Sequence, residues 1–169
     1  MQADAAVKKE QGRVQLAVFR AGQGEYGVDI MKIMEIIRPQ KLTSVPKAPE
    51  FIEGIINLRG NVVPVIDVRK RLGVNSAPVG GSSRDKVLIL LVDGKMLGAV
   101  VDGVKEIMYM DLGEIEETPE AVKGPEAQFL QGVGKAGDRL IMVLDPEKLL
   151  NRRELTELDS AREEPGPEA

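Results

Sequence analysis

The residues able to do chemistry in this chain of 169 are carboxylates, lysines, arginines and hydroxyls, because it contains no histidine and no cysteine. An imidazole base, a thiol nucleophile, a Ser-His-Asp triad and a zinc site of the usual ligands are therefore excluded. Asp67 and Asp145 could form an acid–base pair, but each directly precedes a short helical pattern, where Asp acts as a cap. The sequence offers no nucleophile–base pair, and we expect no catalytic residue.

A glycine-rich stretch, residues 132–137, matches the dinucleotide fingerprint G-x-G-x-x-G. That fingerprint binds phosphate only where a helix begins directly after the glycines. Here the strand pattern of residues 139–143 follows instead. We therefore interpret the motif as a hairpin turn and expect no cofactor.

Two charged clusters are candidates for ion or phosphate binding. The acidic one lacks the spacing of a calcium loop and predicts a solvated face, with no metal; its members are Glu114, Glu116, Glu117 and Glu120. The basic run Arg69-Lys70-Arg71 is short and favours a solvated helix face. The net charge of -4 argues against nucleic acid as a partner. A small carboxylate-dependent enzyme or metal-binding module stays the alternative to a protein without catalytic activity.

The elements that must position these residues are mostly strands. Alternating and short apolar runs predict about ten strands and few helices, which is typical of an all-β sandwich or barrel. Asp93-Gly94 predicts a type I′ hairpin turn, and Asp67 and Asp145-Pro146 predict helix starts. The strands are expected at residues 14–19, 25–28, 35–37, 54–58, 62–66, 86–92, 95–101, 104–110, 129–133 and 139–144.

The organisation predicted around these strands is a flexible leader (1–13), one domain (14–150), and a C-terminal helix with a disordered acidic tail (151–169). The longest strongly apolar run, 87–92, is far too short to span a bilayer, and the first residues lack an apolar signal core. We therefore expect a cytoplasmic protein.

An internal repeat divides the domain. Shifting the sequence by 78 positions places Phe51 on Phe129, Gly54 on Gly132 and Asp67 on Asp145, with matching apolar positions between them. Such a register indicates two similar lobes, about 14–73 and 86–150, each a small closed barrel that ends in a short helix.

The repeat also shows where the lobes differ. The first lobe carries Asn57-Leu58-Arg59-Gly60 at its hairpin turn, whereas Lys135-Ala136-Gly137-Asp138 stand in register in the second. A turn of this kind requires Gly or Asx, so its backbone conformation gives no reason for an arginine at this position. Arg59 is either a solvated turn charge or a planar, five-donor contact for a partner.

The stretch from Ala48 to Arg69, with Asn-Leu-Arg-Gly followed by Pro-Val-Ile-Asp, closely resembles the CheW family of bacterial chemotaxis adaptors. The resemblance continues through residues 26–30, 35–36, 98–104 and 129–132. It implies an all-β fold of two SH3-like five-stranded β-barrel lobes. It also implies a non-enzymatic adaptor that joins the cytoplasmic tip of methyl-accepting chemoreceptors to the regulatory domain of the histidine kinase CheA. Contact with the membrane would be indirect, through the receptors.

The resemblance also implies a receptor-binding groove around the first hairpin, without assigning kinase contacts. Ile33 and Ile36 could equally be core, Gly54 could be a strand bend, and Gly98 and Val104 rest on the resemblance alone. A module of a CheV-like or CheA-like protein is the closer rival, although no receiver or kinase segment follows residue 150. The receptor-binding residues expected are Ile33, Glu35, Ile36, Gly54, Arg59, Gly98 and Val104.

Overall fold

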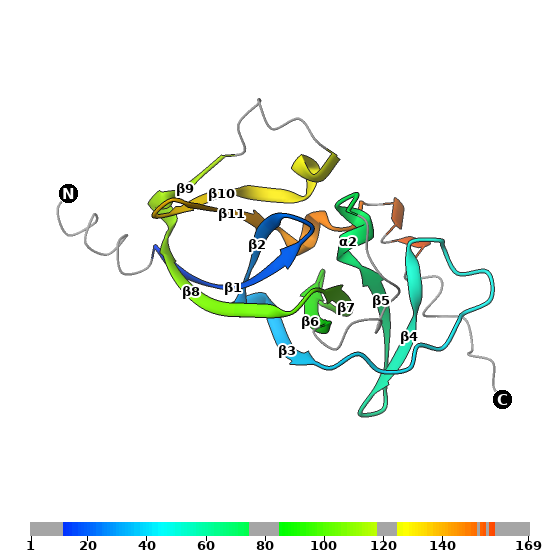
Figure 1. Ribbon diagram of the computed structural model, residues 1–169. Helices are drawn as coiled ribbons and strands as arrows, with labels where there is room; N and C mark the ends of the chain where they lie inside the picture. The colour runs from blue at the N-terminus through cyan, green and yellow to red at the C-terminus, as the bar shows by residue number, and fades with distance from the viewer. Residues whose placement is uncertain (1–11, 75–84, 118–124, 152, 155, 158–169) are drawn as a thin grey trace.

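The structure is a computed structural model that describes residues 12–74, 85–117, 125–151, 153, 154, 156 and 157 (Figure 1). Most of the expected leader (1–13) and most of the expected tail (151–169) lie outside these residues. Within the described ranges, no helix combines the length and the hydropathy needed to cross a bilayer.

Two sheets form two barrel-like lobes, and short helical turns follow several of the strands. The six-stranded lobe has the order β8 (Val104–Asp111), β1 (Arg13–Ala21), β2 (Gly24–Asp29), β11 (Arg139–Leu144), β10 (Leu130–Ala136) and β9 (Ile115–Glu116). The five-stranded lobe has the order β3 (Ile33–Ile37), β6 (Lys86–Val92), β7 (Lys95–Val101), β5 (Asn61–Asp67) and β4 (Ile52–Leu58). The helical turns are η1 (Ile30–Lys32), α2 (Val68–Arg71), η2 (Leu112–Glu114), η3 (Pro125–Phe129) and η4 (Pro146–Lys148).

Each lobe takes strands from both halves of the chain, which corrects the predicted division into 14–73 and 86–150. In Figure 1 the blue β1 and β2 lie beside β8 and β11, whereas β6 and β7 lie with β3, β4 and β5. The repeat itself is present: β2 pairs with β11 in parallel just as β7 pairs with β5, and Gly27 and Gly98 face Val143 and Val65. The first hairpin of each repeat has simply exchanged places with that of the other.

Local turn chemistry matches the sequence expectations. Asp93 and Gly94 have φ of 52° and 75°, the left-handed pair that a type I′ turn requires. The carboxylate of Asp67 accepts from the N–H of Arg69 at 2.9 Å, and that of Asp145 accepts from the N–H of Glu147 at 3.0 Å. Both aspartates are therefore helix caps, as predicted. The stretch 132–137 forms β10 and its turn, so the glycine motif is a hairpin.

The largest apolar core is shared by the two lobes. Phe19 and Leu144 come from the six-stranded lobe, Leu88 and Leu97 from the five-stranded lobe, and Leu149 from the segment after η4. Each large apolar side chain buried here stabilises the fold by about 1.5–3 kcal/mol. The two lobes therefore form one folding unit, and Ile33 of β3 packs against its core.

Candidate functional site

The tip of the β4–β5 hairpin holds Arg59 in an unfavourable backbone conformation. Arg59 and Gly60 form a two-residue turn with φ of 51° and 88°. The side chain of Asn57 accepts the N–H of Gly60 at 2.7 Å, which fixes the turn. A side chain other than Gly, Asn or Asp at such a φ costs about 1 kcal/mol. The turn alone does not select arginine.

The guanidinium of Arg59 is oriented by Glu35 of β3. Nη1 of Arg59 donates to Oε1 of Glu35 at 3.3 Å, and Nη2 donates to Oε2. The hydrogen bonds and charge of Arg59 lower the pKa of Glu35, and those of Glu35 raise the pKa of Arg59. The side chain of Arg59 is 71% exposed and that of Glu35 30%. An ion pair this exposed adds little stability, so its main effect is to aim the guanidinium.

The two elements that carry this ion pair, β3 and the β4–β5 hairpin, also expose apolar side chains. Strand β3 is an edge strand of its sheet, and it exposes Met34 (56%) and Ile36 (39%), which alternate with Glu35 and so project from the opposite face of the strand. Val62, three residues after Arg59, is 58% exposed. Ile33 is half-buried against the shared core. Of the two isoleucines, Ile36 is thus available to a partner and Ile33 mainly packs the strand.

Three of the expected site residues serve packing in this structure. A Cβ on Gly54 would lie 2.9 Å from the carbonyl oxygen of Thr43, beside the β4 bulge. One on buried Gly98 would lie 3.0 Å from Val65 Cγ2. Val104 begins β8 of the other lobe and is half-buried against the core. The structure brings Glu35 and Arg59 into contact and leaves Ile36 exposed at the next position of β3, while a receptor contact of all seven expected residues stays a prediction.

Sequence reasoning missed the exposed Met34 and Val62, and also a counterpart of this site on the other lobe. There Glu106 of β8 pairs with Arg139 at 2.8 Å. Exposed Ile107 and Leu140 stand where the repeat register has Ile36 and Val62. The alternation of the edge strands and the repeat register are the signals that could have found these residues.

The basic run after β5 corrects another expectation. Arg69 is 2% exposed, and not part of a solvated helix face. Its guanidinium contacts Asp67 in a bidentate pair at 2.9 and 3.0 Å, Asp85 at 3.3 Å and Asp102 at 2.9 Å. The buried charge is tolerated because carboxylates from three separate segments surround it. Lys70 is exposed, as expected.

The described members of the acidic cluster, Glu114, Glu116 and Glu117, form no metal-binding arrangement. Among the described residues, no three His, Cys, Asp or Glu side chains are grouped as metal ligands. Glu120 lies outside the described residues. Glu116 forms an ion pair with Lys135 at 2.9 Å.

The architecture is thus two interlocked β-barrel lobes, with an exposed arginine oriented by an edge strand. A family model described as the CheW-like domain matches residues 15–154. The chain belongs to this family.

Relatives and a solved structure agree. The chain is 33% identical over 155 residues to the chemotaxis protein CheW of Treponema pallidum, which covers 90% of both chains. It is 34% identical over 143 residues to CheW of Klebsiella aerogenes, covering 85% of each. The crystal structure of the scaffolding protein TtCheW from Thermoanaerobacter tengcongensis matches with a TM-score of 0.74 and 33% identity, covering 83% of this chain and 90% of that one.

Proposed function

We propose that this chain is a non-enzymatic chemotaxis adaptor, which couples transmembrane chemoreceptors to the histidine kinase CheA in signalling arrays. The observation that carries the proposal is Arg59, held at a strained turn position and aimed by Glu35 of β3, an edge strand that also exposes Met34 and Ile36. Backbone strain kept at a surface position is typical of a functional residue.

The receptor tip is proposed to dock at the Arg59–Glu35 pair and on the exposed apolar residues of the same strand and hairpin, Met34, Ile36 and Val62; this surface is called the Arg59 face. The apolar side chains supply area for one side of a helix, and the guanidinium fork supplies directional donors that fix its register. Arginine is among the residues that most often dominate binding energy at interfaces. The partner surface that fits is therefore an apolar helical tip with an exposed acceptor beside it. The chain would reach the membrane only through such receptors, on their cytoplasmic side.

Charge reversal at Arg59 tests this assignment. We expect Arg59→Asp to weaken binding of a purified receptor tip at least tenfold, which corresponds to about 1.4 kcal/mol. The melting temperature should stay within about 3 °C of wild type, because the ion pair is exposed and Asp tolerates the turn. Isothermal titration and calorimetric melting measure the two effects.

Lys47 provides the matched control, because it is another exposed cation of the same half with a positive φ, 66°. Lys47→Asp makes the same change of charge in the same backbone region and should bind like wild type. Equal affinities for both variants would reject docking at Arg59. A large loss of stability in Arg59→Asp would instead show that the arginine has a structural role.

Titration of the chain with Mg²⁺ or Ca²⁺ tests the competing class, a metal-dependent enzyme or metal-binding module. The adaptor should give no heat of binding, whereas a metal-dependent protein would give a measurable heat.

A further inference from the structure

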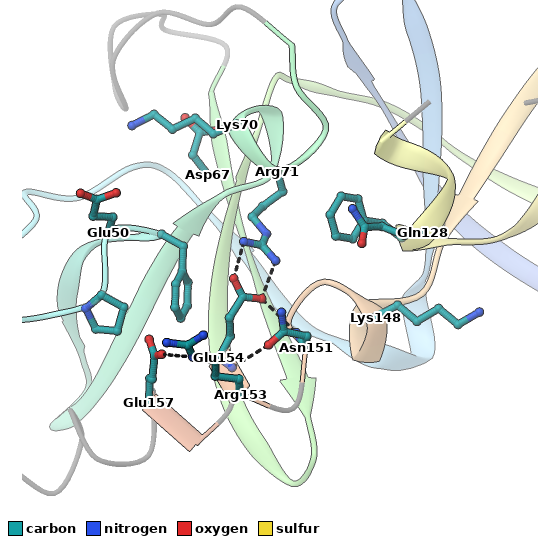
Figure 2. A pocket seen from close by; sticks show the side chains of 13 residues that line it. Glu50, Asp67, Lys70, Arg71, Gln128, Lys148, Asn151, Arg153, Glu154 and Glu157 are labelled. Atoms are coloured by element: carbon teal, nitrogen blue, oxygen red, sulfur yellow. Dashed lines mark hydrogen bonds and ion pairs between the residues drawn. The ribbon is translucent and has the colours of Figure 1, made fainter. Parts of the chain in front are cut away.

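Two features away from the Arg59 face could bind a partner, a pocket and an edge strand. The pocket, of about 810 Å³, lies at the α2 end of the β4–β5 hairpin, and Figure 2 shows that Arg71 pairs there with Glu154 and Arg153 with Glu157. A ligand in the pocket would have to compete with these ion pairs. The edge strand β8 instead presents its outward groups directly to a partner.

Strand β8 is the longest of the four strands that end the two described sheets. It has eight residues, against seven in β4, five in β3 and two in β9. The edge of β4 is covered, because Thr43 and Ile55 exchange two backbone hydrogen bonds at 2.9 Å. Within the described residues β8 pairs with β1 alone, along one of its edges (Figure 1). A long edge with unpaired N–H and C=O groups is a template for another strand.

The outward residues of β8 form a regular row. The exposed members of this row are Lys105, Ile107, Tyr109 and Asp111. They alternate with Met108 and Met110, which pack in the core of the same lobe. The strand pairs with β1 without a bulge from Glu106 to Asp111, and Lys105 lies in the bulge just before this stretch. The free edge is therefore regular along most of the exposed row.

This row is complementary to itself when two strands run antiparallel. A two-fold axis at Met108 places Ile107 opposite Tyr109 of a second copy, and Lys105 opposite Asp111 of that copy. Each pairing then occurs twice, because the axis makes the contact isologous. Apolar–aromatic and opposite-charge pairs are those that stabilise neighbouring strands.

The neighbouring registers lack this match. An axis at Ile107 would place Lys105 opposite Tyr109, and an axis at Tyr109 would place Ile107 opposite Asp111. An axis between two residues would set outward residues against inward ones, because side chains alternate along a strand. The row therefore selects the register with the axis at Met108.

The two charges of the row are already linked to opposite charges of their own chain. Lys105 contacts Glu25 at 2.9 Å, and Asp111 contacts Arg13 at 3.6 Å. Antiparallel pairing joins these two ion pairs, one from each copy, into a line of alternating sign. A network of charges contributes more than an isolated exposed pair.

We propose that two copies of this chain associate through β8 in this register, so that their six-stranded sheets become one continuous sheet across a two-fold axis. A single pair of strands buries less surface than a permanent dimer requires, so the association is weak and reversible. The contact is separate from the Arg59 face and does not rest on the proposed function.

Sedimentation equilibrium of the full chain tests the association. We expect a monomer–dimer equilibrium that shifts towards the dimer as the protein concentration rises to about 1 mM. Lys105→Glu and Asp111→Lys should each weaken the dimer about tenfold or more, because like charges then face each other across the axis. The chain with both changes should recover the wild-type affinity, since its opposite charges have only exchanged places.

Lys135→Glu is the matched control for these charge reversals. Lys135 also contacts a glutamate at 2.9 Å, but it lies on β10, so this variant should dimerise like wild type. Melting curves show whether every variant is folded. A wild-type chain that stays monomeric at about 1 mM, or a doubly changed chain that dimerises as weakly as the single variants, overturns the proposal.

Engineered cysteines test the register, because the chain has no cysteine of its own. Directly opposite residues have Cα atoms about 4.5–5.5 Å apart, within reach of a disulfide, whereas diagonal neighbours are about 7–8 Å apart. Under mild oxidation, a mixture of Ile107→Cys and Tyr109→Cys chains should therefore form linked dimers several times faster than either chain alone. Leu91→Cys, at another exposed position, is the control. Equal rates for the mixture and the single variants would reject this register.

Discussion

Arg59 shows most clearly how a single residue can indicate function here. The other two-residue turns between described strands are Gly22-Gln23, Asp93-Gly94 and Gly137-Asp138, and in each of them the left-handed positions hold Gly or Asp, which accept that backbone at little cost. Arg59 occupies the same kind of turn with a side chain that the geometry disfavours. The sequence already singles out Arg59, because only one of the repeated hairpins carries an arginine at its turn. The ion pair of Arg59 with Glu35 is seen only in the folded structure.

Replacement of Arg59 by Asn separates stability from binding. Asn-Gly is the preferred type I′ pair, so the variant should keep or slightly raise the free energy of unfolding despite the lost ion pair. Affinity for the receptor tip should fall at least tenfold. Urea denaturation and titration calorimetry give the two values. A loss of stability above about 1 kcal/mol would contradict the strain argument.

Arg69 is the residue whose removal should destabilise the fold most. Arg69→Met leaves the carboxylates of Asp67 and Asp85 buried without their guanidinium, at a cost of about 3–5 kcal/mol. Lys70→Met, on the next residue, breaks only an exposed pair with Glu53 and should cost less than about 1 kcal/mol. Urea denaturation compares them, and equal effects would show that the buried network contributes nothing special.

Glu25 gives a pH dependence with a defined sign. Hydrogen bonds from Arg139 and Lys105 lower the pKa of Glu25 from 4.5 to about 2. Because the folded-state pKa is depressed, the contribution of Glu25 is complete above about pH 4.5 and is lost as the pH falls towards 2. Denaturation at pH values between 2 and 7 should show that the free energy of unfolding falls less on acidification for Glu25→Gln than for wild type. An equal fall of the free energy of unfolding in both proteins would contradict this role of Glu25. Glu50→Gln, which removes an exposed carboxylate, is the control and should behave like wild type.

At the scale of elements, strands and turns were predictable but their closest contacts were not. Alternation located the main strands, and Asx and Gly residues located the turns and caps. The burial of Arg69 was not predictable, because its three aspartates come from segments far apart in the sequence. A run of cations is usually solvated, and only the tertiary fold shows the exception.

Gly54 illustrates such a contact between elements. Gly54→Ala should lower the free energy of unfolding by about 1–3 kcal/mol, because its Cβ would press on the backbone of Thr43 at 2.9 Å. Gly113→Ala should change it little, because nothing lies within 4 Å of the added carbon. Thermal melting of the two variants makes the comparison. An unaffected Gly54→Ala variant would mean that the segment before β4 shifts freely.

At the scale of the whole molecule, the exchanged hairpins tie the two halves into one unit. The repeat register identified the duplication correctly, but it could not say which hairpin completes which sheet, since both copies have similar apolar patterns. Two short connections determine which hairpin completes which sheet. The turn η1 leads from β2 directly into β3 of the other lobe, and Asp102-Gly103 leads from β7 into β8.

The exchange predicts how fragments behave. Chains cut between Gly80 and Gly81 should each lack a cooperative unfolding transition, because neither half contains all strands of either sheet. Mixing the halves should restore the circular dichroism and the cooperative melting of the intact chain. A first half that melts cooperatively by itself would contradict the strand pairing described here.

Calorimetry of the ternary complex tests most directly the proposal that one molecule of this chain bridges two partners. The regulatory domain of the kinase is titrated into the chain alone, and then into the chain saturated with receptor tip. Because we propose that the Arg59 face binds the receptor and not the kinase, we expect similar affinity and one-to-one stoichiometry in both titrations. Loss of kinase binding once the tip is bound, or binding to neither partner, would contradict it.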